Sequence, residues 1–408
     1  MAERFDIIII GGGMVGATLA LALAAHGLSS ALVDRADLPA TTAPAFDGRV
    51  SAIASASANM LRAIGLGDLM DEHGQPIVQI RTTDGLSPLH LHFDSAQAGT
   101  GPLGWMVENR MVRVRLLQTI AGQRLVRLIA PATVASVERD GPAATVTLAD
   151  GRILAAPLVA AADGRQSALR RAAGIRVAQW RYDATALVTS IAHARPHDGV
   201  AFELFFPGGP FAILPMRDDR EGRHRSAIVW TVREREAEGW AGLHRRAFAR
   251  ELEGRMGGFL GAVELLTPVT RYPLAFHHAE RFIDRRLALV GDSGHGIHPI
   301  AGQGLNLGLR DVAALTQALV EGARLGLDPG SPAVLERYGR WRALDVTAIS
   351  AATDLLSRLF NLPGRPAAAV RRLGLAAVNR LPALKAAFMA EARGEGGDLP
   401  ALLRGELA

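Results

Sequence analysis

The sequence predicts an α/β fold: a Rossmann-like, discontinuous nucleotide-binding domain with an inserted β-rich domain and C-terminal helices. A glycine-rich turn joins an apolar strand to a helix near the N-terminus. Two further apolar strands, ending near residues 160 and 290, are each followed by an Asp with a Gly beside it, and strand-like runs crowd residues 181–271. At 408 residues the chain is long enough for two packed domains and a terminal extension.

The composition excludes several kinds of chemistry. There is no cysteine, which rules out disulfides, cysteine nucleophiles and cysteine-ligated iron–sulfur clusters. Lys385 is the single lysine, so lysine-centred catalysis is not expected. The twelve histidines show no metal-ligand spacing, and we expect no metal site. Scattered arginines beside acidic residues, with a net charge of +5, do not indicate a nucleic-acid partner.

The uncharged stretch Ile7–Ala25 is long enough to imitate a membrane span or a signal peptide. However, three glycines interrupt it after four isoleucines, and Glu3 and Asp6 precede it. This pattern is typical of strand, turn and helix, so we expect a cytoplasmic chain that does not span a membrane.

That stretch is the first motif. Its parts are the strand Phe5–Ile10, the turn Gly11-Gly12-Gly13-Met14-Val15-Gly16, a helix to about His26 and the strand Ala31–Val33. In this G-x-G-x-x-G pattern Gly11 makes the tight turn, Gly13 admits a pyrophosphate, and Gly16 lets helix and strand pack closely. Asp34 ends the second strand, where a carboxylate can bind a ribose. The motif predicts a dinucleotide but does not separate NAD from FAD.

A second motif follows the apolar strand Leu287–Val290. It begins with Gly291-Asp292 and reaches a helix start at Gly304-Leu305-Asn306. A carboxylate at a strand end can bond a polyol, and glycines before a helix can offer N–H groups to an electron-rich ring edge. One cofactor serving both motifs must be long. FAD has a ribityl chain and an isoalloxazine ring beyond its pyrophosphate, so FAD is predicted.

A third segment, Ala161–Arg170, contains Asp163-Gly164 and follows the apolar run Leu154–Ala160, which we expect to be one strand. Taken alone, this segment is a turn with Ser167 near a helix start. We therefore expect its role to be structural.

Together these segments resemble the single-component FAD-dependent aromatic hydroxylases, in which the Gly11–Gly16 turn, Asp163-Gly164 and the second motif occur in this order. The run His295–Gly308 and the segment Arg49–Ile53 look like the ubiquinone-biosynthesis branch, of the UbiH/UbiF type. The resemblance spans nearly the whole chain. Ser293-Gly294 departs from it, because the family usually has two alanines there.

The resemblance implies which residues contact the cofactor. They are Asp34 and Arg35 for the adenosine part, Arg49 for the pyrophosphate, Arg110 for the ribityl chain, Asp163 where flavin and reductant meet, Asp292 for the ribityl–pyrophosphate region, the backbone of Gly304, Leu305 and Asn306 for the pyrimidine edge, and the Pro299 carbonyl for the reactive flavin carbon. His295 and His298 are expected to order their loop, with a catalytic role for His298 as the alternative. Arg113 and Arg115 are expected to be surface charges.

The chain is predicted to divide discontinuously. Residues 1–75, 101–180 and 272–345 would form the FAD-binding domain, 76–100 and 181–271 the substrate domain, and 346–408 a helical extension. Four phenylalanines of the insert are expected to be mostly core, with one or two lining a pocket: Phe202, Phe205, Phe206 and Phe211.

The implied activity is hydroxylation of the aromatic ring of a polyprenylated ubiquinone precursor through a flavin hydroperoxide. O2 would be the co-substrate, and NAD(P)H or a redox partner would supply electrons. We expect transient docking of the reductant, because the glycine run Gly257–Gly261 lacks the strand and acid of a second dinucleotide motif. Two alternatives stay open: an FAD-dependent dehydrogenase or reductase of a lipid-like substrate, and a non-catalytic flavin-binding subunit of a biosynthetic complex.

From Leu355 onward apolar residues at helical spacing accompany basic ones, including Arg371, Arg372 and Arg380. Such a tail suits an amphipathic helix on anionic lipid, which would give peripheral contact with the inner membrane face. It equally suits helices that cap the flavin domain. Contact with other ubiquinone-biosynthesis proteins is left open.

Overall fold

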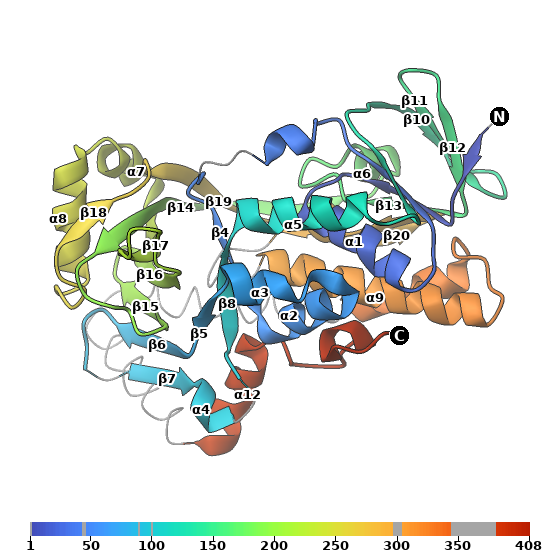
Figure 1. Cartoon of the computed structure of the whole chain (residues 1–408). Helices are drawn as coiled ribbons and strands as arrows, with labels where there is room; N and C mark the ends of the chain where they lie inside the picture. The colour runs from blue at the N-terminus through green and yellow to red at the C-terminus, as the bar shows by residue number, and fades with distance from the viewer. Residues whose placement is uncertain (1, 43–45, 89, 99–100, 297–303, 344–380) are drawn as a thin grey trace.

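The structure is a computed structural model, and it describes residues 2–42, 46–88, 90–98, 101–296, 304–343 and 381–408 (Figure 1). Among these residues no helix is both long enough and apolar enough to cross a bilayer.

The first half of the fold is built on a six-stranded sheet of order β20-β21-β13-β2-β3-β9, whose strands come from both ends of the chain. Its strands are Ile283–Asp284, Leu287–Leu289, Leu158–Ala161, Ile7–Ile10, Ser30–Val33 and Val126–Ile129. All are parallel except β20. Every residue of β2 is buried, as expected for a parallel strand covered on both faces.

The two faces of this sheet are covered differently. Ile7 and Ile9 pack with the helices α1 (Met14–Ala25), α5 (Asn109–Ala121) and α9 (Gly304–Arg324). Ile8 and Ile10 pack instead with a four-stranded sheet, whose members are β1 (Glu3–Arg4), β12 (Ile153–Ala156), β11 (Ala144–Leu148) and β10 (Val134–Glu138). Successive side chains of a strand alternate between faces, so the four-isoleucine run supplies both cores.

The run Leu154–Ala160, expected to be one strand, is two strands in different sheets. β12 ends at Ala156 and β13 begins at Leu158, with Pro157 between them. Proline cannot donate to a ladder, which explains the break at this position.

The second half of the fold is a nine-stranded sheet of order β22-β19-β14-β17-β16-β15-β6-β7, with β18 pairing to β14. Its strands are His295–Gly296, Thr270–Ala279, Val177–His193, His224–Val232, Gly209–Met216, Val200–Phe206, Gln79–Asp84, His90–Asp94 and Val263–Leu265. The helices α7 (Glu234–Ala241) and α8 (Arg245–Arg255) pack on one face of it (Figure 1). β6 pairs with β15, so residues from 76–100 extend the sheet of the insert; the proposed domain boundaries remain a prediction.

Short elements connect the two halves. The three-stranded sheet has the order β4-β8-β5, with strands Val50–Ala54, Gly104–Glu108 and Gln75–Ile77. Further helical segments are η1 (Pro39–Thr41), α2 (Ser55–Leu61), η2 (Arg62–Leu66), α3 (Asp68–His73), α4 (Ser95–Ala98), α6 (Ala168–Ala172), η3 (Gly291–Ser293), the helical residues 332–343, α12 (Pro382–Ala392) and η5 (Ala401–Arg404).

The end of the chain packs on the half of the fold that contains the six-stranded sheet. The Arg310 guanidinium of α9 donates to the carbonyls of Gly394 and Gly396, at 2.9 and 3.0 Å. Leu402 and Leu403 of η5 are buried in the core that contains α1 and α9. This last part therefore caps that half of the fold, whereas the predicted amphipathic stretch with Arg371, Arg372 and Arg380 lies outside the described residues.

One buried carboxylate ties α9 to the parallel sheet. Asp311 accepts hydrogen bonds from the Gly291 N–H and the His295 Nε2, both at 2.6 Å, and from the Arg342 Nε at 2.5 Å. Burial acts to raise the pKa of Asp311, but His295 and Arg342 outweigh it and hold the pKa below its ordinary value. The group is therefore an anion inside the core.

We predict that Asp311→Ala lowers the free energy of unfolding by about 3–5 kcal/mol, because the buried Arg342 loses this carboxylate partner. Asp328→Ala is the matched control: its ion pair with Arg286 is partly exposed, and the loss should be about 1 kcal/mol or less. Urea unfolding followed by circular dichroism measures both changes. Equal losses would contradict a special role for Asp311.

Candidate functional site

Backbone segments approach closely at the turn between β2 and α1. Gly11 has a φ of 109°, and a Cβ there would lie 2.3 Å from the Ala162 carbonyl oxygen. A Cβ on Gly16 would lie 1.9 Å from the Gly11 carbonyl oxygen. A Cβ on Gly13 would meet no atom within 4 Å. Packing therefore requires the first and third glycines, while open space lies over the second, where a phosphate could reach the helix N-terminus.

A cleft of about 370 Å³ lies beside this turn. Its lining includes Gly12, Gly13, Asp34, Asp47, Arg49 and Arg113. The Asp34 carboxylate is fixed by the N–H groups of Gly12 and Ala36, at 2.6 and 2.7 Å. Arg35 is exposed and does not belong to this lining.

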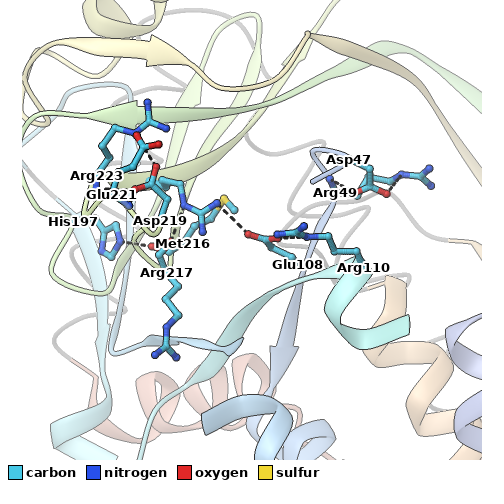
Figure 2. Close-up of polar contacts among 11 residues, drawn as sticks. Asp47, Arg49, Glu108, Arg110, His197, Met216, Arg217, Asp219, Glu221 and Arg223 are labelled. Carbon is cyan, nitrogen blue, oxygen red and sulfur yellow. Dashed lines mark hydrogen bonds and ion pairs between the residues drawn. The ribbon is translucent and has the colours of Figure 1, made fainter. Parts of the chain in front are cut away.

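Two arginines flank Asp47 at the edge of the cleft. Arg113 donates to Asp47 at 3.0 Å, and Arg49 lies 3.4 Å from it, as Figure 2 shows for the Arg49 pair. Burial acts to raise the pKa of Asp47, but the Arg49 N–H and the Arg113 guanidinium outweigh it and lower the pKa. Arg49 also lines the large cavity described below, so its exposed guanidinium stands between the two spaces.

Two acids follow neighbouring strands at the carboxyl edge of the parallel sheet. Asp292 follows β21, and its exposed side chain lines the large cavity. The backbone carbonyl of Asp292 accepts a hydrogen bond from the His277 ring at 2.8 Å. Asp163 follows β13, and its Oδ2 accepts the N–H groups of Ala168 and Leu169 at the start of α6. Its Oδ1 is buried and has no hydrogen-bond partner among the described residues. Ligands of open α/β sheets bind at this edge.

The start of α9 faces the same edge. Gly304 is exposed and lines the large cavity, and Leu305 is half-buried. The Asn306 side chain accepts from the Ala54 N–H at 2.9 Å and donates to the Ala52 carbonyl at 2.7 Å. Asn306 thereby holds the helix start against β4. The N–H groups in the first turn of a helix have no partner within the helix, so they are suited to a ligand.

The large cavity, of about 470 Å³, lies between these segments and the nine-stranded sheet. The side next to the six-stranded sheet contributes Arg49, Arg165, Asp292 and Gly304, and His295 of the short strand β22 lies among them. The sheet contributes a mainly apolar face that includes Ala186, Val188, Ala212, Leu214 and Val229. The cavity therefore has a polar side, formed by the predicted cofactor residues, and an apolar side.

Known proteins resemble this chain over almost its whole length. Residues 4–353 match the FAD binding domain family. The ubiquinone hydroxylase UbiL of Rhodospirillum rubrum is 46% identical over 403 residues, which cover 98% of this chain and 92% of that protein. The 3-demethoxyubiquinol 3-hydroxylase of Escherichia coli is 33% identical, over 93% of this chain and 96% of that protein.

The chain belongs to this family of FAD-dependent hydroxylases. The fold agrees: the p-nitrophenol 4-monooxygenase PnpA of Pseudomonas putida superposes with a TM-score of 0.78, at 18% identity, covering 97% of this chain and 100% of that one. The predicted α/β class, the family resemblance and FAD as cofactor are thus confirmed.

The hydroxylase's own residues fit FAD. The open space over Gly13 suits a pyrophosphate, and the cleft beside Asp34 suits an adenosine. The buried Oδ1 of Asp163 can accept a hydrogen bond from a ligand. Arg49 lines both the cleft and the cavity. FAD carries its phosphates between its two ring systems, so a cation at this position suits a cofactor that extends through both spaces.

Other predicted positions have different outcomes. Arg110 pairs with Glu108 at 2.7 Å (Figure 2), and it does not belong to the described lining of either space. His298 and Pro299 lie outside the described residues, so their roles stay predictions. His295 is buried on Asp311, as expected of a residue that orders its loop.

Two expectations about single side chains were wrong. Arg113 is not a plain surface charge, because it pairs with Asp47 and lines the nucleotide cleft. Arg115, on a different face of the same helix, pairs with Asp68 and is the surface charge that the sequence predicts.

The other wrong expectation concerns the phenylalanines of the insert, none of which lines the large cavity. Phe205 and Phe211 are buried, and Phe202 and Phe206 pack against a core.

Sequence reasoning also missed two cavity residues, Arg165 and Glu203. Arg165 follows Asp163-Gly164 in the segment Ala161–Arg170, for which the sequence predicts a structural role. Glu203 stands inside the apolar run Ala201–Phe206, and a lone acid in such a run is a signal that could have been used.

We predict that Gly13→Leu abolishes most FAD binding while the protein stays folded, because the side chain would fill space that the protein leaves open. Gly254→Leu, at an exposed helix position with equally open space, is the matched control. Flavin absorbance and thermal unfolding of both purified variants test this. Full flavin content in Gly13→Leu would refute the assignment of the turn.

We predict that Asp292→Ala weakens FAD binding about ten-fold or more, the equivalent of one lost hydrogen bond to a charged group. Asp284→Ala, in β20 opposite the first residue of β21, should leave the affinity unchanged. The effect of His298→Ala should be smaller than that of Asp292→Ala. Flavin titration of the apoproteins gives the order, and the reverse order would overturn the role of Asp292.

Proposed function

We propose that this hydroxylase acts on the aromatic ring of a polyprenylated ubiquinone precursor. The observation that carries the proposal is the cavity of about 470 Å³, which has predicted cofactor residues on one side and an apolar sheet on the other. The names of the relatives from Rhodospirillum rubrum and Escherichia coli support a substrate on the path to ubiquinone. The apolar face suits a prenylated ring and keeps water away from the reacting atoms.

Bound FAD would supply the redox chemistry and activate O2 for the transfer of one oxygen atom to the ring. The protein would hold this cofactor through the turn at Gly13, the carboxylates of Asp34 and Asp292, and the guanidinium of Arg49. The N–H groups at the start of α9 would fix the pyrimidine edge. Pro299 and His298 keep their proposed places near the flavin ring.

The reductant is proposed to bind only transiently. The glycine run at residues 257–261 follows the helix α8 and not a strand, so it lacks the context of a dinucleotide motif. NAD(P)H would then dock near Asp163 and Arg165, or an outside redox protein would supply electrons. Stopped-flow flavin reduction, with and without substrate, separates a transient from a stoichiometric complex.

Arrival of the substrate from a membrane is a further part of the proposal. A polyprenyl chain partitions into lipid, and residues 355–380 combine apolar and basic side chains. Sedimentation with anionic vesicles at low and high salt tests this, since salt screens the attraction of basic residues to lipid. Replacing Arg371, Arg372 and Arg380 by Gln should weaken sedimentation and leave the flavin content intact.

We predict that the FAD-loaded protein incorporates one atom of ¹⁸O2 into a prenylated phenol, and that deleting its gene causes a less hydroxylated quinone precursor to accumulate. Mass spectrometry measures both. Flavin reduction or substrate oxidation without ¹⁸O in the product would indicate the dehydrogenase or reductase. FAD binding with no substrate-stimulated oxygen consumption would indicate the non-catalytic subunit.

A further inference from the structure

One acidic side chain interrupts the apolar face of the large cavity. Glu203 of β15 lies beside Ala212 of β16 and Thr82 of β6 in the sheet register. Among the described residues, it is the one acid that a strand of the nine-stranded sheet contributes to the lining. Its neighbour Leu204 belongs to the core on the opposite face, so strand alternation directs Glu203 toward the cavity.

The carboxylate of Glu203 has no compensating partner in the protein. No hydrogen bond or ion pair joins it to any other residue that the structure describes. Glu203 is half-buried and lines the cavity, and desolvation by its surroundings raises its pKa to about 7. A desolvated acid without a partner costs stability, and such groups are concentrated at functional sites.

Other charged or titratable groups face the cavity from the surrounding elements. They are Tyr272 of β19 on the sheet side, and Arg49, Arg165, Asp292 and His295 on the side of the predicted cofactor residues. Asp84 of β6 lies on the same face of the sheet as Glu203, but it is buried and does not line the cavity. Both arginines, Arg49 and Arg165, lie on the cavity side that carries the predicted cofactor residues, and not on the sheet that carries Glu203. None of these groups forms an ion pair with Glu203 in the described structure, so a structural role in a charge network does not account for it.

We propose that Glu203 is a catalytic residue that accepts the proton of a phenolic hydroxyl on the substrate ring. This proposal rests on the proposed function, in which the cavity holds such a ring. In the step, the phenol O–H bond breaks, its electron pair stays on the ring oxygen, and the proton joins a carboxylate oxygen. The phenolate is more electron-rich at its ring carbons, which favours oxygen transfer to them. Glu203 returns the proton to the product oxygen, so the step consumes no oxidant or reductant.

The surroundings of Glu203 make its carboxyl group suitable for proton transfer. An acid with a pKa near the working pH can both take and return a proton. An ordinary surface glutamate would be too weak a base for a phenol, and a fully neutral one would not accept a proton. The apolar neighbours Ala212 and Val229 provide the desolvation that sets this balance.

The raised pKa also has a consequence for stability. Between the ordinary value of 4.5 and about 7, the folded protein keeps a proton that the unfolded chain has lost. The contribution of Glu203 to stability therefore falls as the pH rises through that window and then levels off. Glu203→Gln should remove this part of the pH dependence, so its melting temperature should decline less than that of the wild type over the same window.

The test uses the FAD-loaded protein with 2-prenylphenol as the probe and its methyl ether as the probe without a proton. We expect the wild type to prefer the phenol about ten-fold or more when the pH is above the pKa of Glu203, as a hydrogen bond to a charged group requires. We expect the preference to shrink below that pKa. Glu203→Gln should lose the preference and the rise of hydroxylation rate through about pH 7, with its FAD content unchanged. Glu264→Gln, an exposed acid of the same sheet, should behave as the wild type.

A phenol preference that is independent of pH in the wild type, or that is retained in Glu203→Gln, would overturn the role of Glu203. The wild-type comparison needs no variant and holds even if Glu203→Gln fails to fold. Failure of the proposed function gives a different result. In that case no probe is hydroxylated by the wild type, while the phenol and ether affinities still decide whether Glu203 accepts the proton.

Discussion

The ion cluster at Asp311 is the constraint on which the site depends. Three donors from two separate stretches of the chain meet at this carboxylate: Gly291 after β21, His295 of β22, and Arg342. Placing a carboxylate in the core is costly, and the three donors compensate for its lost hydration. Because Asp311 belongs to α9, the same contacts fix the helix start that faces the cavity. Asp292, one residue beyond Gly291, is positioned by this arrangement.

The cavity also requires that the two sheets keep their relative positions, and contacts through the connecting three-stranded sheet serve this purpose. Glu108 of β8 accepts hydrogen bonds from Arg110 at 2.7 Å and from Arg225 of β17 at 3.1 Å. The half-buried Glu108 thus links the connecting sheet to the wall of the cavity. A cavity that lies between two domains can exclude water only if such links limit their separation.

The sequence predicted the parts of the site that depend on local backbone chemistry. The strand, turn and helix around Gly13 follow from residue types in one short stretch, and so does the position of Asp34 after a strand. The parts that depend on tertiary pairing were not accessible in the same way. Arg113 and Arg115 are alike in sequence terms, and only the packing of α5 decides which one meets Asp47. Likewise, Pro157 marks a break within Leu154–Ala160, but the sheet that each part joins depends on strands elsewhere in the chain.

For Glu203, the sequence context and the position in the sheet together define the environment of the carboxyl group. Its sequence context marks an acid in an apolar strand, which either pairs with a cation or stands alone. The register with Ala212 and the lining of the cavity decide for the second case. The property that excludes water from the ring is then the same property that raises the pKa of the acid to about 7. The exclusion of water from the cavity and the basicity of Glu203 therefore depend on each other. Any change that admits water to the sheet face would lower the pKa of Glu203 toward its ordinary value and make it a weaker base.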